Sequence, residues 1–342
     1  MAGGAVLLAT HPAFETHDNG PGHPERPARL RAVLAGIDAA GLGEAVVTVS
    51  PRPATRAELE GLHRGPYLDA LERFCEAGGG ALDADTAAVP ASWEAALLAA
   101  GAGPDAVERL DCGEGAAAFL AVRPPGHHAL PGQAMGFCLL NNLAVTAAVL
   151  AGRGERVLVV DWDAHHGNGT QDAFYEDGRV LYVSLHEYPL YPFSGRLAET
   201  GGGEGAGSNV NLPLPAGATG DVVLAALDEV VAPVVDAFGP TWLLVSAGFD
   251  GHRSDPLTGL GYSSGDFADF TRRVLEWAPS GRRVFFLEGG YDLDALAASA
   301  GACVAGLAGV THRPEPSTVG GPGRPVVEAA VAQHRRSGTG RS

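Results

Sequence analysis

The sequence has few basic residues, few cysteines and no long apolar run. Lys and Arg total 23 against 40 Asp and Glu, which gives a formal net charge of −17 at pH 7. This balance argues against nucleic-acid binding, because sequence-independent binding needs basic patches that displace the counterions of the phosphates. The excess of acid would attract cationic substrates, although a need for solubility explains it equally well.

The four cysteines lie far apart and form no Cys-x-x-Cys pair; they are Cys75, Cys112, Cys138 and Cys303. We therefore expect reduced thiols rather than disulfides or thiolate metal ligands. No uninterrupted apolar segment is long enough to cross a bilayer, and residues 1–10 lack the basic flank and the apolar length of a signal peptide. The sequence thus predicts a cytoplasmic protein without membrane association.

The chain alternates apolar runs of strand length with longer segments of helical pattern. This alternation is typical of an α/β fold, in which helices cover both faces of a parallel sheet. With 342 residues and 46% hydrophobic content, the chain can build one large core. We predict a single catalytic domain over residues 1–311, followed over 312–342 by a Pro/Gly-rich linker, a short helix near 326–335 and a disordered tail.

Polar clusters follow five of the predicted strands at their carboxyl ends. The strands are 118–122, 157–160, 180–183, 242–246 and 284–287, and the clusters are 123–128, 161–165, 184–186, 247–255 and 288–291. Chance would scatter such clusters to both ends of the strands. Because an open α/β sheet binds its ligands at the carboxyl ends of its strands, we expect one site built from all five loops.

A metal is the simplest explanation for the cluster after the second of these strands. Asp161, Asp163 and His165 stand at alternate positions, so an extended backbone would send their side chains to one side. If these side chains are buried, their charges need a counter-ion such as a divalent metal. The alternative to a metal site is a polar strand-to-helix loop in which Asp and His only cap and hydrogen-bond. Asp163 and His165 form the best pair, with Asp250 or Asp255 as a third ligand. Three protein ligands leave open positions, as in catalytic zinc sites.

A zinc ion held by two carboxylates would need a general base and a donor for the developing oxyanion. His127 and His128 are the candidate bases, Tyr291 supplies a phenolic donor, and Asp161 could orient an imidazole instead of binding metal. Each residue taken alone could have a purely structural role: the histidines could hydrogen-bond to the loop backbone, and the tyrosine could be a buried aromatic with its hydroxyl satisfied. Their convergence on neighbouring strand ends favours a catalytic site.

Several long motifs resemble the zinc-dependent histone deacetylase superfamily. They occupy residues 23–27, 123–129, 136–138, 161–171, 246–250 with 255–256, and 287–291. The sequence is most similar to the class II branch and its bacterial histone deacetylase-like amidohydrolases, since Asn168 stands where class I enzymes carry Asp. Acetylpolyamine amidohydrolases are related. The resemblance covers roughly residues 5–310 and implies an eight-stranded parallel sheet flanked by helices.

The resemblance also implies the ligands of this fold. One zinc ion per chain would be bound by Asp163, His165 and Asp255. Potassium would be bound by Asp161, Ser184 and Leu185 together with the backbone of Asp163 and His165, with a second site near Phe174, Asp177 and Val180. A narrow substrate channel would be lined by Gly136, Phe137, Tyr191, Leu257 and Gly289.

The catalytic roles implied by the resemblance fall on five residues. His128 would act as general base and then as general acid, supported by Asn168. His127, paired with Asp161, would be mainly an electrostatic stabiliser. Tyr291 would polarise the scissile carbonyl and stabilise the oxyanion.

Two substrates fit this chemistry: an Nε-acetyl-lysine side chain of a peptide or protein, and an acetylpolyamine. One group of polyamine-selective relatives carries Glu where this chain has Leu257, and the loop between Phe14 and Pro27 lacks an insertion of the bacterial polyamine enzymes. Both differences favour lysine. A non-enzymatic module would have lost a zinc ligand or Tyr291, and a two-metal arginase-like enzyme would show more Asp ligands. A homo-oligomer is compatible with the sequence, which does not specify one.

Overall fold

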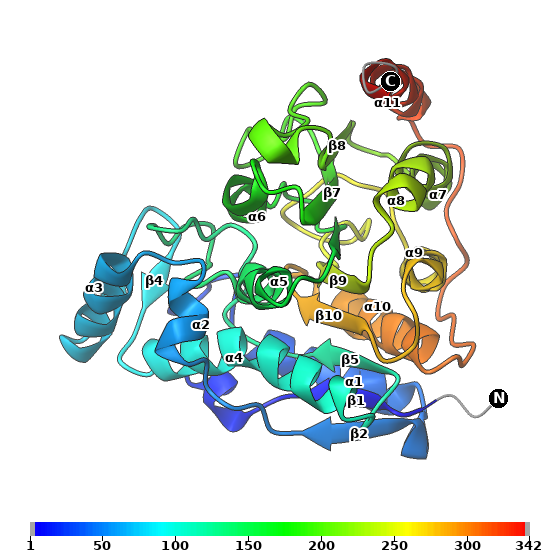
Figure 1. Cartoon of the computed structure of the whole chain (residues 1–342). Coiled ribbons are helices and arrows are strands. Elements are labelled where there is room, and N and C mark those ends of the chain that lie inside the picture. Colours follow the sequence, from blue (N-terminus) through cyan, green and yellow to red (C-terminus); the bar gives the residue numbers. More distant parts are fainter. Residues whose placement is uncertain (1–3, 339–342) are drawn as a thin grey trace.

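The computed structural model describes residues 4–338, and its centre is an eight-stranded sheet (Figure 1). The strand order is β2-β1-β5-β10-β9-β6-β7-β8, and every neighbouring pair is parallel. The strands are β1 (Val6–Ala9), β2 (Val46–Val49), β5 (Ala117–Leu120), β6 (Val157–Asp161), β7 (Val180–Glu187), β8 (Asn209–Leu214), β9 (Trp242–Ala247) and β10 (Arg283–Leu287). This confirms the predicted single α/β domain with a parallel sheet.

The central strands are buried on both faces because helices cover the sheet. On one side α4 (Ser92–Asp111) packs against α5 (Asn142–Gly152), and both contact central strands. A second layer contains α1 (Ala28–Ala39), α10 (Leu293–Leu307) and α9 (Ser264–Val274), which pack in that order. Continuous apolar strands such as β6, whose residues are all fully buried, are what such coverage requires.

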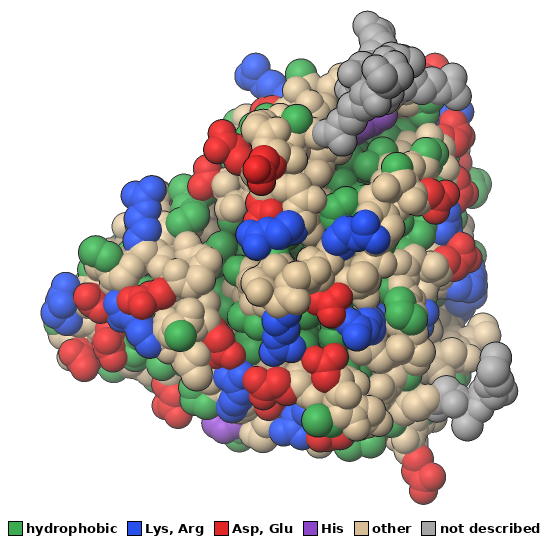
Figure 2. All heavy atoms as spheres, in the orientation of Figure 1, with side chains coloured by type: hydrophobic (Ala, Val, Ile, Leu, Met, Phe, Trp, Pro, Cys, Tyr) green, Lys and Arg blue, Asp and Glu red, His purple; other side chains and the backbone are tan. Residues whose placement is uncertain are grey.

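Smaller elements surround this core. They are α2 (Arg56–Glu60), α3 (Gly65–Glu76), the antiparallel pair β3 (Gly80–Ala81) and β4 (Ala87–Ala88), α6 (Asn168–Phe174), α7 (Gly220–Ala226) and α8 (Ala232–Phe238). In Figure 1, α3 and β4 lie at the side of the sheet away from α10. On the face shown in Figure 2, basic and acidic side chains are interspersed rather than separated into patches.

The five strands that precede the polar clusters are neighbours in the middle of the sheet. Their order is β5-β10-β9-β6-β7, so their carboxyl ends lie side by side. The register places Asp161 opposite Ser184 of β7 and opposite Ser246 of β9. Loops that are far apart in the sequence therefore meet at one edge of the sheet.

The C-terminal segment runs along α9 and ends in α11 (Arg324–Gly338). Residues 312–323, which we predicted to be a linker, contact α9 through several side chains. The helix predicted near 326–335 spans 15 residues, and the last part of the predicted tail, 339–342, lies outside the described residues. Over residues 4–338, no helix combines the length and the apolar character that a bilayer crossing requires.

Candidate active site

A compact acidic group lies at the carboxyl ends of β6 and β9. Asp163, His165 and Asp250 each offer a ligand atom, and these atoms lie within 4.8 Å of one another. The Nδ1 atom of His165 is 2.9 Å from Oδ2 of Asp250 and 3.2 Å from Oδ1 of Asp163. Backbone donors fix both carboxylates: Gly289 N–H donates to Asp163 at 2.8 Å and Ala164 N–H to Asp250 at 2.8 Å.

Two glycines allow the loops to approach this group. A Cβ atom on Gly248 would lie 2.0 Å from Oδ2 of Asp163, and one on Gly289 would lie 2.3 Å from Oδ2 of Asp250. Any larger residue would displace a carboxylate. Gly289, which we predicted to line the channel, therefore lies directly beneath the acidic group.

Asp255 lies beside this group rather than within it. Its Oδ2 accepts the backbone N–H of Tyr291 at 2.7 Å, and its Oδ1 accepts that of Leu257 at 3.0 Å. Of the two candidates for the third ligand, Asp250 therefore lies with Asp163 and His165, whereas Asp255 contacts the backbone of Tyr291. Burial, the charge of Asp163 and the charge of Asp255 together raise the pKa of Asp250 to about 7.

The donor set fits a zinc ion. Asp163 and Asp250 are completely buried, and a further carboxylate, Asp255, is 7% exposed close by. Buried carboxylates that crowd one another are stable only when a cation or protons offset their charge. Carboxylate oxygens and one imidazole nitrogen are ligands that zinc accepts, and three of them would leave a position open for water or substrate.

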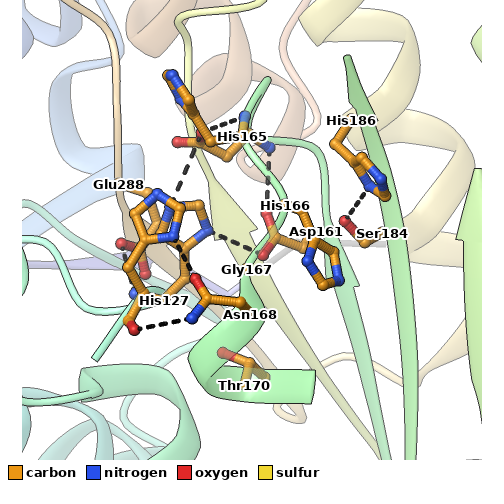
Figure 3. A network of polar contacts seen from close by, with 12 residues as sticks. His127, Asp161, His165, His166, Gly167, Asn168, Thr170, Ser184, His186 and Glu288 are labelled. Carbon is orange, nitrogen blue, oxygen red and sulfur yellow. Dashed lines mark hydrogen bonds and ion pairs between the residues drawn. The ribbon is translucent and has the colours of Figure 1, made fainter. Parts of the chain in front are cut away.

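Two adjacent histidines follow β5, and each has a different partner. Figure 3 shows the contact of His127 with Asp161. His127 Nδ1 is 3.1 Å from Oδ2 of Asp161, and His128 Nδ1 is 2.8 Å from Oδ1 of Asn168. The two rings lie 4.1 Å apart, and His127 Nε2 is 3.8 Å from Oδ1 of Asp163. The structure therefore brings together the four residues that we predicted to form two pairs.

These partners separate the protonation states of the two imidazoles. Burial alone would lower the pKa of His127, but the carboxylates of Asp163 and Asp161 outweigh it and raise that pKa to about 10. For His128, burial and the positive charges of His127 and His165 hold the pKa well below its usual value. The two imidazoles therefore differ in proton affinity: the pKa of His127 is raised and that of His128 is lowered.

Glu288, at the end of β10, anchors the histidine loop. Its Oε2 accepts the backbone N–H groups of Gly126 at 2.7 Å and of His127 at 3.2 Å. The side chain is completely buried, and burial raises its pKa to about 7. We predicted a reactive cluster at Glu288 but no role for it. Only the spatial adjacency of β10 and β5 reveals the contact.

Arg29 connects the N-terminal motif to the tyrosine loop. The completely buried guanidinium donates to the carbonyl oxygen of Gly290 at 2.6 Å and to that of Glu288 at 2.5 Å, and lies 4.9 Å from the ring of Tyr291. Its charge is offset by Glu25 at 3.1 Å. Burial raises the pKa of Tyr291 well above its usual value, so its phenol keeps the proton that it could donate. The motif at residues 23–27 contains Glu25, but the sequence did not predict that Glu25 would pair with Arg29 beside the tyrosine loop.

Aromatic rings flank the catalytic candidates. The ring of Phe137 is 5.9 Å from that of Tyr291, and the ring of Tyr191 is 5.2 Å from that of His128. Gly136 has a φ of 55°, and a Cβ there would lie 2.4 Å from Cδ2 of His128. These contacts place three predicted channel residues around the histidine and the tyrosine. Of the other two predicted channel residues, Gly289 lies against the acidic group and Leu257 is 38% exposed.

The predicted potassium residues of β7 lie next to Asp161, since Ser184 is its partner in the sheet register. The hydroxyl of Tyr182 donates to Oδ2 of Asp161 at 3.1 Å, and Ser184 Oγ is 2.8 Å from Nδ1 of His186. Leu185 is completely buried between them in β7. Figure 3 shows Ser184 and His186 together on one strand, beside Asp161 at the end of β6 and His166 in the loop that follows. The roles of Tyr182 and His186 in this network were not predicted.

Comparison with known proteins gives concordant matches over most of the chain. The model of the histone deacetylase domain matches residues 23–307. A probable deacetylase of Archaeoglobus fulgidus is 39% identical over 293 residues, which cover 84% of this chain and 81% of that protein. A histone deacetylase-like amidohydrolase of Pseudomonas aeruginosa is 38% identical over 277 residues, covering 79% of this chain and 73% of that protein.

A solved structure agrees with these matches. The crystal structure of the HDA15 HD domain superposes with a TM-score of 0.88 and 34% sequence identity, covering 98% of this chain and 95% of that one. Its likeness extends over the sheet and both helical layers described above. The family model, the relatives and the shared fold together show that the chain belongs to the histone deacetylase family.

Proposed function

We propose that this member of the deacetylase family is a zinc-dependent amidohydrolase. It removes acetyl, or a similarly short acyl group, from Nε-acyl-lysine side chains and releases acetate. The observation that carries the proposal is a pair of adjacent histidines beside the Asp163–His165 pair, of which His127 contacts a carboxylate and the other contacts an amide oxygen. Such a pair supplies a base and a fixed positive charge at the same place.

Asp163, His165 and Asp255 would hold the zinc ion, with Asp250 as the alternative third ligand. The motif match supports Asp255, and the distances among the carboxylates support Asp250. Bound there, zinc would polarise the acyl carbonyl and make a water molecule more acidic. Asp161, Ser184 and Leu185 would bind potassium behind the site, an assignment supported by the family resemblance.

His128 moves the proton. Because its Nδ1 lies against the amide oxygen of Asn168, Nδ1 carries the hydrogen and Nε2 keeps a free lone pair. Nε2 would accept a proton from the attacking water and then deliver it to the leaving amine. The lowered pKa of His128 keeps this nitrogen unprotonated in the resting enzyme.

His127 and Tyr291 stabilise the charge that develops during attack. The imidazolium of His127, held by Asp161, offers a positive charge that does not move. The phenol of Tyr291 would donate a hydrogen bond to the carbonyl oxygen, and such donors strengthen as negative charge grows. Phe137 and Tyr191 would hold the alkyl chain between their rings.

Acetylpolyamines are the second candidate substrate, and a specific observation favours them. The backbone N–H of Phe137 donates to the hydroxyl of Thr86 at 3.0 Å, and Thr86 in turn donates to the carboxylates of Asp85 and Asp83. Two carboxylates therefore lie near a channel wall, where they could attract the distal ammonium of a polyamine. Leu257, which is apolar and exposed, favours the lysine side chain instead.

A comparison of substrates tests this function. The zinc-loaded protein would be assayed on acetyl-lysine peptides, trifluoroacetyl-lysine and acetylated polyamines, with Tyr291→Phe as the matched inactive control. We expect a higher kcat/KM for the lysine substrates. Faster turnover of acetylpolyamines would reverse the substrate assignment, and no hydrolysis of any amide would refute the proposed function.

A further inference from the structure

The C-terminal strap, residues 312–323, packs across the start of α9. Thr318 contacts Asp266 twice, through its N–H at 3.0 Å and its hydroxyl at 2.6 Å. Gly265 permits the close approach, since a Cβ there would lie 2.3 Å from the carbonyl oxygen of Glu315. These contacts fix the strap to the start of α9 on both sides of residue 316, next to Glu315. The family model ends at residue 307, before the strap begins.

The Glu315 carboxylate is held by the N-terminus of α9. Its Oε2 accepts the backbone N–H of Ser264, the first residue of the helix, at 2.9 Å and the Ser264 hydroxyl at 3.0 Å. A helix N-terminus favours a negative charge because its first N–H groups have no partner within the helix. The other oxygen, Oε1, pairs with Arg253. Glu315 thus joins the helix to the loop after β9.

His252 links Glu315 to the part of the loop that carries Asp255. Its Nε2 is 2.8 Å from Oε2 of Glu315, and its Nδ1 accepts the backbone N–H of Ser254 at 3.1 Å. Because Nδ1 accepts, Nε2 carries the hydrogen and donates it to the carboxylate. The backbone N–H of Asp255 donates to the carbonyl oxygen of His252 at 2.8 Å. The imidazole is 4% exposed and is fixed on both sides.

We propose that Glu315 is a positioning residue for zinc, acting through His252 to hold the loop of residues 250–255. The inference rests on the proposed zinc site, but not on the choice between Asp250 and Asp255, since both belong to this loop. Neither Glu315 nor His252 would touch the metal or the substrate. Among the described residues, their hydrogen bond and the ion pair of Arg253 with Glu315 join the side chains of this loop to the strap.

The test compares Glu315→Ala with Glu315→Gln and with a control in the same strap, Thr318→Val. Thr318 contacts Asp266 and Gly220 but not the loop. Zinc content would be measured by elemental analysis, zinc affinity by competition with a chromogenic chelator, and loop mobility by hydrogen exchange at the Ser254 and Asp255 amides. Melting temperatures of all variants would report general destabilisation.

We expect Glu315→Ala to weaken zinc binding by about 10- to 100-fold, the usual effect of losing a partner of a metal ligand, and to speed exchange in the loop. Glu315→Gln, whose amide oxygen can still accept from His252, should retain most of the affinity. Thr318→Val should keep zinc while lowering the melting temperature. His252→Phe, which keeps the ring volume, should reproduce the loss, and the double variant with Glu315→Ala should add little to it.

Unchanged zinc affinity and unchanged loop exchange in Glu315→Ala would overturn the inference. Equal zinc loss in Thr318→Val would also overturn it, because the effect would then be general destabilisation. If Glu315→Ala fails to fold, His252→Phe serves as the test: weaker zinc binding and faster loop exchange would support the inference, and no change in either would overturn it. A wild-type protein that binds no zinc would instead refute the proposed function on which the inference depends.

Discussion

Substitutions of Asn168, which is hydrogen-bonded to His128, can raise or lower the pKa of this proposed base. Asn168→Asp would place a negative charge where the amide oxygen now lies, 2.8 Å from Nδ1 of His128. With roughly 4 Å between the charge centres and an effective dielectric constant of about 20, the attraction is about 4 kcal/mol, an upper bound of about 3 pKa units. We expect a rise of about 1–3 units in the pKa of His128.

The direction in which the pH profile shifts follows from the role of His128 as the base. Only neutral His128 can accept a proton, so kcat/KM falls when the pH drops below its pKa. In the wild type, burial and the charge of His127 lower this pKa, so activity should persist below the usual histidine range. In Asn168→Asp the acidic limb should move upward by about 1–3 pH units, with a tenfold loss per unit below the new pKa.

The assay is a pH profile of kcat/KM on an acetyl-lysine peptide, with zinc content measured at each pH. Asn168→Ala is the matched control. It removes a hydrogen bond that raises the pKa of His128 without adding charge, so its acidic limb should stay or move downward. An acidic limb that is the same in all three proteins would show that His128 is not the titrating base.

Four further substitutions test other parts of the site. Tyr291→Phe should lower kcat by about 10²–10³-fold with zinc content unchanged, and near-normal turnover would contradict its role as donor. Asp255→Ala should reduce bound zinc more than Asp250→Ala, as measured by elemental analysis, and the reverse order would make Asp250 the third ligand. Leu257→Glu should raise kcat/KM for acetylspermidine relative to an acetyl-lysine peptide, and an unchanged ratio would show that Leu257 does not line the channel mouth.

The sequence predicted the parts of the fold that depend on local pattern. Apolar strand runs such as 157–160 and the polar residues that follow them predicted which edge of the sheet carries the site, and the five strands proved to be neighbours. The pairing of His127 with Asp161 and of His128 with Asn168 was expected from the family resemblance. The structure shows both contacts, and their catalytic roles stay predictions.

Contacts between distant segments could not be predicted. Arg29 and Glu288 are charged residues without periodicity, and their buried partners lie on other strands and loops. Glu315 lies in a Pro/Gly-rich segment, where composition suggests a linker. Its contact with His252 depends on how the strap crosses α9, which no local pattern encodes.

The most direct test of the central claim is removal and restoration of zinc. The protein would be stripped with a chelator and reloaded with increasing Zn²⁺, while bound metal and acetate released from an acetyl-lysine peptide are measured together. We predict that activity rises in proportion to bound zinc and saturates at one ion per chain, with Asp163→Ala inactive throughout. Full acetate release by the metal-free protein, or none at one zinc per chain, would contradict the account.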